Sequence, residues 1–377
     1  MTDAFFFLRF AVEKKVQSSL RLMHARSFFY LILNGFILGL AMGVLMPRLR
    51  AETAATPQHV EITGSHRLRL TYDFNVVWPR GGDYSATFHL PLPPETGTQH
   101  IEHFSSTLKG RIETDGAVPP HRVLTATLHH RKGDERELHW RVEITGLFTT
   151  RQLTGGSAAS PSPIVPPAPS EFLSSTESIN WESDAFQHWL DASGLRRMPD
   201  ETPARYGRRV FDYFKAHGDY SYPPSSPWNA AAVCRRLRTD CGGFSLVFAA
   251  ACRANKIPAR LLVGQWFKTR ELPDGTLEQT GKQAHVIAEF FDPEIGWVPE
   301  DISSTLLKIP GHTDTDFFGR DPGYFFAWHV DTDFHFAVPQ KTDEHVQWIQ
   351  NPSLWFSKNA EEASDTISHH WKFEPLP

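Results

Sequence analysis

A cysteine in the second half of the sequence has surroundings that favour nucleophilic chemistry. Cys241 follows Thr-Asp, precedes two glycines and leads into an apolar run over 246–252. This run predicts a buried helix that begins at or just after Cys241, where the positive end of the helix dipole stabilises a thiolate. Gly242 and Gly243 are expected to leave the backbone open to an approaching acyl carbonyl. A buried, inert cysteine is the alternative, and Cys252 is of that kind.

A histidine and an aspartate follow on two predicted strands joined by a turn. Pairing of Phe291 with Trp297 across the turn is the expected register. It places Asp301 on the same face as His285, within reach of a side-chain hydrogen bond. A histidine base needs such an acceptor to fix its tautomer and to stabilise the imidazolium. Without that partner, His285 would more often be a structural histidine.

These residues carry a resemblance to a known family. Cys241 and the stretch Ile257-Pro258-Ala259-Arg260, which continues to Gly264, look like the core motif of the transglutaminase-like superfamily. His285, Gly296-Trp297 and Asp301 resemble the family's histidine strand and its Trp-x-x-x-Asp continuation. The motifs cover about 60 residues, and the resemblance extends loosely over 180–356.

The resemblance implies an α+β fold with a papain-like core, in which the cysteine helix packs on an antiparallel sheet. It makes Cys241 the nucleophile, His285 the general base and Asp301 the residue that orients the base. The implied activity is acyl transfer at an amide bond through a thioester, as in a peptidase, amidase or transamidase. A non-catalytic scaffold or binding module at the cell surface is the alternative.

The sequence departs from the family pattern at two places. Lys256 replaces the usual glycine before Ile-Pro, which costs about 1 kcal/mol if this residue is left-handed. Gly242 and Gly243 replace bulkier residues of animal transglutaminases, which weakens the case for protein cross-linking. The Cys241 N–H is the default oxyanion donor, and Tyr222 or Trp228 are candidates for a second.

Helix and strand signals surround these motifs. Thr202 is a good N-cap, Pro203 suits the first helical position and Gly218 a helix stop. A shorter helix is expected over 184–190. Strands are expected over 260–266, 284–291 and 296–301, and over 324–330, where aromatic residues favour core packing over binding sugars.

The N-terminal region carries a targeting signal. Residues 28–46 are uncharged and Pro47 follows; as a helix they would rise about 28 Å, close to the bilayer's hydrocarbon thickness. Basic residues predominate before this stretch, so 1–26 is expected in the cytoplasm, 27–47 in the membrane and the remainder in the periplasm. An uncleaved anchor is preferred over a cleaved signal that would release a secreted protein.

Two folded regions are expected beyond the membrane. Residues 58–153 alternate apolar and polar side chains in short runs, which predicts a small β-sandwich in which His129 and His130 lie at the surface. Residues 154–175 are rich in proline and serine, which indicates a linker. Residues 176–377 would then form the transglutaminase-like domain.

Composition excludes several other functions. The chain has 377 residues, a net charge of −5 and a pI near 6.4, so a nucleic-acid binder is not expected. Three cysteines form neither a disulfide framework nor a paired zinc motif, and no phosphate loop or dinucleotide fingerprint occurs. We therefore expect no cofactor and no metal. The expected partners are the membrane and a peptide or protein amide, with the cell envelope as its source.

Overall fold

The computed structural model describes part of the second of two units in the chain, Thr56–Pro377. The described residues are 58–78, 83–117, 119–155, 169–266, 269–271, 277–279, 284–307, 316–338, 341–357 and 367–377. The predicted cytoplasmic segment (1–26) and membrane segment (27–47) lie outside them. None of the described helices has the length and apolar character needed to cross a bilayer.

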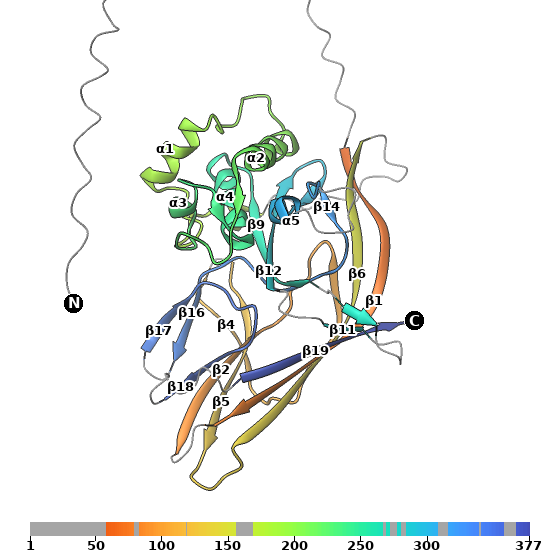
Figure 1. Cartoon of the computed structure of the whole chain (residues 1–377), viewed down its shortest axis with the longest axis vertical. Helices are drawn as coiled ribbons and strands as arrows, with labels where there is room; N and C mark the ends of the chain where they lie inside the picture. The colour runs from red at the N-terminus through yellow and green to blue at the C-terminus, as the bar shows by residue number, and fades with distance from the viewer. Residues whose placement is uncertain are drawn as a thin grey trace, which may run out of the picture. The chain divides into compact units, whose positions relative to one another are not determined.

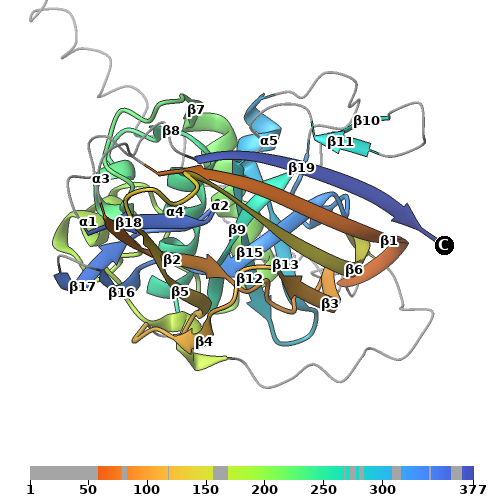
Figure 2. The same ribbon diagram turned by 90° about the horizontal axis from the view of Figure 1, so that it is seen from below.

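A seven-stranded antiparallel sheet is built on two long paired strands, β1 (Gln58–Val77) and β6 (Glu137–Gly155). In β1 the alternation puts Leu70, Tyr72 and Phe74 in the core. The other edge of β1 pairs with β19 (Ile367–Leu376), which joins residues 305 positions apart (Figures 1 and 2). The remaining strands are β3 (Gln99–Ser106), β10 (Thr269–Glu271), β11 (Leu277–Gln279) and β14 (Arg320–Asp321).

A four-stranded sheet shares a hydrophobic core with the first. Its strands are β18 (Ser353–Phe356), β2 (Tyr84–Pro91), β5 (Arg122–His130) and β4 (Arg111–Thr114). Phe88 of β2 stacks on Phe74 of β1 at 5.2 Å between ring centroids. The sequence predicts this two-sheet arrangement in 58–153 alone, whereas β10, β11, β14, β18 and β19 join it from beyond residue 176. As a domain boundary, the 154–175 linker stays a prediction.

One surface prediction for the sandwich is wrong. His129 is exposed, but His130 is buried and its ring lies 5.4 Å from that of Trp78. Adjacent strand residues face opposite sides, as expected. Because the face of β5 that carries His130 is covered by the first sheet, one of the two histidines becomes a core residue.

A further four-stranded antiparallel sheet lies in the C-terminal half, with the order β13-β12-β9-β15. The strands are β9 (Ala259–Trp266), β12 (Ala284–Asp292), β13 (Gly296–Glu300) and β15 (Phe325–Val330). The expected strands are confirmed to within a residue or so at each end, and Phe291 pairs with Trp297 as predicted. The aromatic side chains Phe325, Phe326 and Trp328 are buried, which confirms their packing role.

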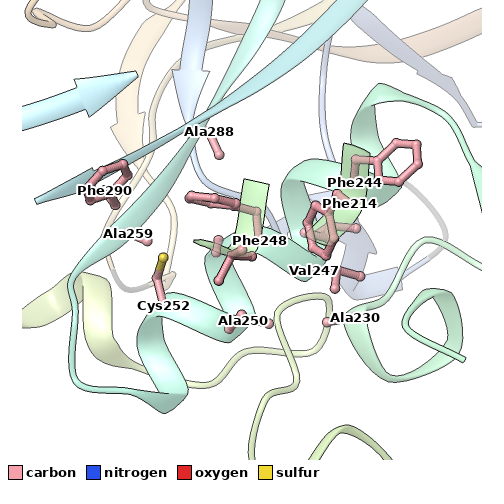
Figure 3. Packing of buried hydrophobic residues seen from close by; sticks show 14 of the residues in the cluster. Phe214, Ala230, Phe244, Val247, Phe248, Ala250, Cys252, Ala259, Ala288 and Phe290 are labelled. Carbon is pink, nitrogen blue, oxygen red and sulfur yellow. The ribbon is translucent and has the colours of Figure 1, made fainter. Parts of the chain in front are cut away.

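The helix α4 (Cys241–Ala254) packs on β12 and β9 of this sheet. Its side chains are buried almost throughout, because the helix is covered on both sides. In Figure 3, Phe214 lies with Phe244 near one part of α4, whereas Cys252 lies nearer Ala259. Phe248 reaches Phe290 of β12, with 5.9 Å between ring centroids. A helix that begins with the candidate cysteine therefore packs on an antiparallel sheet.

The other helices surround α4. The predicted caps of α2 (Pro203–His217) are confirmed: the Thr202 side chain accepts the Arg205 N–H, and Gly218 ends the helix. The shorter helix predicted over 184–190 is also confirmed. The remaining described elements here are η1 (Ser170–Leu173), α1 (Asp184–Ala192), α3 (Ala230–Val233), α5 (Ile302–Leu307), the parallel pair β7 (Asp219–Tyr220) and β8 (Arg238–Thr239), and the hairpin β16 (Phe334–Val338) with β17 (Lys341–Val346).

Polar side chains join the sandwich to the α4 sheet. The Gln99 side chain hydrogen-bonds to the backbone of β15 as a paired strand would. It donates to the Ala327 carbonyl at 3.0 Å and accepts the Ala327 N–H at 2.9 Å. Arg151 of β6 donates to the Trp297 carbonyl at 2.6 Å and pairs with the buried Glu289. These contacts fix the sheet that carries the candidate histidine against the sandwich.

Candidate active site

Cys241 is the first residue of α4, as the sequence predicts. The N-cap is Asp240, whose Oδ1 accepts the Gly243 N–H at 3.1 Å and thereby holds the helix start in place. Cys241 is partly exposed, whereas Cys234 and Cys252 are buried. Burial raises the pKa of the Cys252 thiol well above its ordinary value. Of the three thiols, only Cys241 combines a helix N-terminus with access to solvent.

His285 and Asp301 meet as the register predicts. The His285 Nε2 and Asp301 Oδ2 atoms lie 2.7 Å apart, and both side chains are buried. Asp301 follows β13 directly and precedes α5, so the Ser304 N–H donates to its Oδ1 at 2.9 Å. The hydroxyls of Ser303 and Ser304 donate to the same carboxylate. These donors hold the carboxylate in the position that orients the imidazole.

The electrostatics of the pair favour its charged form. Burial by itself would lower the pKa of His285, but Asp301 and the Cys241 sulfur outweigh it and raise this pKa to about 10. Burial likewise acts to raise the pKa of Asp301, yet the His285 charge and the serine hydroxyls hold it below its ordinary value. The imidazole is therefore protonated and the carboxylate ionised at neutral pH.

The carboxyl group of Glu300, the residue before Asp301, has a pKa shifted in the opposite direction. Glu300 is buried beside Asp301, and burial, followed by the charge of Asp301, raises its pKa well above the ordinary value. Burial therefore favours the neutral form of Glu300, and Asp301 is the carboxylate bonded to the imidazole.

The third member of the group lies near the histidine. The Cys241 side chain is close enough to the His285 ring to help raise the pKa of that ring. Because Asp301 engages Nε2, Nδ1 is the ring nitrogen left to face the sulfur. The structure thus brings together the three residues that the sequence singles out, in the order thiol, imidazole, carboxylate.

The two candidates for a second oxyanion donor are poorly placed for that role. The Trp228 indole N–H already donates to Asp240 Oδ1 at 2.9 Å, and Tyr222 is 76% exposed. The tyrosine in the electrostatic surroundings of the thiol is instead Tyr220, whose pKa is raised by burial and then by Cys241 and Asp240. Sequence reasoning misses Tyr220, because β7 is too short to give a pattern.

The expectation that the two glycines leave the backbone open is wrong. A Cβ at Gly243 would collide with the Thr239 side chain, and one at Gly242 would lie 2.5 Å from the Trp348 indole. Both glycines therefore make room for neighbouring side chains of this chain. Lys256 is left-handed, with φ of 61°, so the predicted strain at the exit of α4 is present.

No candidate metal site accompanies these groups. Within the described ranges, no three His, Cys, Asp or Glu side chains gather as a metal-binding cluster. A hollow of about 780 Å³ opens elsewhere, over β1, β6 and β19, and its lining includes Asp73, Trp140 and Arg141. The chemistry available at Cys241 is that of a thiol, an imidazole and a carboxylate.

Comparison with known proteins identifies the family of this region. Residues 195–302 match the transglutaminase-like superfamily. None of the curated proteins compared with the chain matches it. Among the similar solved structures are two of low identity to the chain. A candidate cysteine protease from Cytophaga hutchinsonii is 14% identical with a TM-score of 0.45, over 85% of this chain and 93% of that chain.

The second of these structures is the periplasmic domain of TgpA from Pseudomonas aeruginosa. It is 15% identical with a TM-score of 0.32, over 67% of this chain and 88% of that chain. The family match itself spans α2, α4 and the strands that carry or precede Cys241, His285 and Asp301. By that match, this chain carries a transglutaminase-like domain.

Proposed function

We propose that this protein is a cysteine-nucleophile acyl-transfer enzyme that acts on amide bonds. Cys241 is the nucleophile, His285 the general acid and base, and Asp301 the residue that orients the imidazole. The observation that carries the proposal is the 2.7 Å bond between His285 Nε2 and Asp301 Oδ2, close to a partly exposed thiol at a helix start that helps raise the pKa of His285.

The reaction follows from these positions. The Cys241 thiolate attacks the amide carbonyl carbon, and the helix-start N–H of Cys241 donates to the developing oxyanion. The C–N bond then breaks, and the His285 imidazolium gives its proton to the departing amine, which leaves a thioester on the sulfur. Water, deprotonated by the now neutral imidazole, attacks the thioester and releases the acid. An amine in place of water would give transamidation.

The charge distribution supports this sequence of steps. The raised pKa of His285 keeps the ring protonated until the proton is transferred to the departing amine. Asp301 stabilises the imidazolium up to that step. A non-catalytic scaffold would gain little from a buried ion pair next to a partly exposed thiol, because burying charge is costly.

Covalent labelling tests the proposal. The full chain would be treated with a peptidyl chloromethyl ketone, and the labelled cysteine identified by mass spectrometry. We expect modification of Cys241 and not of the buried Cys234 or Cys252. Cys241→Ala should abolish labelling and amide turnover, whereas Cys252→Ser serves as the matched control with a reactive thiol at 241. Equal labelling of all three thiols, or none, would favour the scaffold.

The proposed location is outside the cytoplasm. The uncharged stretch over 28–46 and the basic residues before it support a single-pass anchor with the catalytic domain in the periplasm. A secreted form after cleavage is the alternative. Protease added to intact spheroplasts should degrade the domain after residue 50; its protection would reverse the topology. Peptides of the cell envelope are the first substrates to test.

A further inference from the structure

The segment 347–350, between β17 and β18, passes across the candidate active site. At one end the Gln347 side chain donates to the Trp228 carbonyl and to Ser178 Oγ. At the other end the Gln350 side chain donates to the carbonyl of His285 at 3.0 Å. The segment is thus tied to both sides of the site, and it lies outside the stretch that matches the family.

Trp348 in this segment lies against the residue next to the nucleophile. A Cβ on Gly242 would approach the indole atoms Cη2, Cζ2 and Cζ3 at 2.5, 3.1 and 3.3 Å. The benzene half of the indole therefore occupies the place where any larger residue at 242 would project. Trp348 remains partly exposed, so the ring is not wholly enclosed by the protein.

A second indole supports the first. The ring of Trp228 packs edge-on against Trp348, with 5.2 Å between centroids. Its own N–H is fixed by Asp240, the N-cap of the nucleophile helix. Both rings are therefore held relative to Cys241 by contacts at the start of α4.

The opposite side of the site is aromatic as well. The ring of His285 lies 5.3 Å from that of Trp266 and 6.1 Å from that of Phe325. Trp266 and Phe325 are uncharged, so this side of the site presents aromatic rings beside the pair of His285 and Asp301. Planar apolar groups stack well on such rings.

We propose that Trp348 is a substrate-binding residue that selects acyl groups with an aromatic or bulky apolar substituent near the scissile carbonyl. The acyl part stays attached to Cys241 after the amine has left, so it must lie beside Gly242 and the Trp348 indole. This inference rests on the proposed acyl-transfer function and specifies its substrate class.

Two activated esters test the selectivity. The p-nitrophenyl esters of acetic acid and of 3-phenylpropionic acid differ in the acyl group alone. For the full-length wild type, we expect kcat/KM to be larger for the phenyl ester. In Trp348→Ala the ratio of the two kcat/KM values should fall about tenfold, chiefly through the phenyl ester, because that ester loses the aromatic stacking that the indole provides. Trp348→Phe, which keeps a ring, should retain most of the ratio.

Two further variants separate a change in acyl selectivity from a general disturbance of the fold. Trp189→Ala removes a partly buried indole that packs on Phe186 and Tyr213, away from Cys241, and should leave the ratio unchanged. Gly242→Ala pushes a methyl group into the Trp348 ring. Like Trp348→Ala, it should lower the ratio of kcat/KM for the phenyl ester to that for the acetyl ester. Iodoacetamide, which is too small to need the indole, should alkylate Cys241 in Trp348→Ala at nearly the wild-type rate.

The outcomes are distinct. An unchanged ester ratio in both Trp348→Ala and Gly242→Ala, with alkylation intact, would overturn the role of Trp348 and leave the proposed function standing. If the wild type hydrolysed neither ester and Cys241 resisted iodoacetamide, the proposed function and this inference would fall together.

Discussion

Among the residues that the structure describes, two buried histidine–aspartate pairs have the same separation and different surroundings. In the α4 sheet, His285 Nε2 lies 2.7 Å from Asp301; beside the sandwich strand β5, His121 Nδ1 lies 2.7 Å from Asp115. In both pairs each side chain is less than a tenth exposed. Distance and burial do not distinguish them.

The two pairs differ in the group that lies on the other side of the imidazole ring. The His285 ring faces the Cys241 thiol, whereas the His121 ring stacks on Phe334 at 3.8 Å and meets His329 edge-on at 5.6 Å. Asp115 also accepts the backbone N–H of His121, so it holds a turn together. A buried His–Asp pair therefore does not by itself identify a catalytic site, and the thiol at a helix start is what distinguishes His285 as a candidate catalytic residue.

Neutralising each aspartate is the strongest test of this difference. Asp301→Asn should lower kcat about 10²- to 10⁴-fold, because asparagine packs similarly but cannot stabilise the imidazolium. Asp115→Asn should leave kcat within about twofold, while loss of its charged hydrogen bonds costs about 1–3 kcal/mol of stability. Amide turnover and urea unfolding of both variants measure the two effects. Equal loss of activity in both would remove the distinction.

The histidines around the two pairs should also differ in how they titrate. The pKa of His285 is raised to about 10, whereas burial, followed by the neighbouring His121, lowers the pKa of His329 well below its ordinary value. Carbon-13 NMR of labelled histidine rings should show His285 protonated and His329 neutral at pH 7–8. His285→Gln assigns the first signal. A His285 signal that titrates near pH 6.5 would contradict the ion pair.

The raised pKa also predicts how stability changes with pH. Folded His285 keeps a proton that the unfolded chain releases above about pH 6.5, so its contribution is complete below that pH and is lost as the pH rises through about 10. Between these values one proton gives a slope of at most about 1.4 kcal/mol per pH unit. Urea unfolding of the wild type from pH 7 to 9 should show a decline that His285→Gln reduces; parallel curves would argue against it.

A change away from both pairs should alter stability alone. Lys256 is left-handed at the end of α4, where glycine carries no steric penalty. Lys256→Gly should therefore raise the unfolding free energy by about 0.5–1 kcal/mol and leave kcat unchanged. Thermal unfolding with amide turnover on the same samples checks this. Lys256→Asn is the matched comparison and should give a smaller gain, because asparagine tolerates the left-handed region better than lysine does. A destabilised Lys256→Gly would show that the lysine side chain contributes packing.

The parts of the site that the sequence predicts depend on local rules. A capping aspartate and an apolar run indicate the start of α4, and one hairpin register brings Asp301 beside His285. Both follow from contacts between residues close in the sequence. The strain at Lys256 is likewise evident from a missing glycine.

The parts that escape prediction depend on distant contacts. Nothing near Gly242 indicates that Trp348 lies against it, and His130 gives no sign that a second sheet covers it. The sequence of β18 and β19 does not show that these strands pair with β2 and β1, far away in the chain. Alternation reveals which face of a strand is buried but not which partner buries it.

The pairing of β19 with β1 has a consequence for the order of folding. During synthesis β1 appears early, and one of its edges stays without a partner until residues 305 positions further on arrive. An uncovered strand edge with alternating apolar residues invites association with other chains. The segment that contains Trp348 is also synthesised late, so α4 is made before the indole that packs against Gly242. The surface that we propose for the acyl group is therefore complete only after the C-terminal part of the chain has been synthesised.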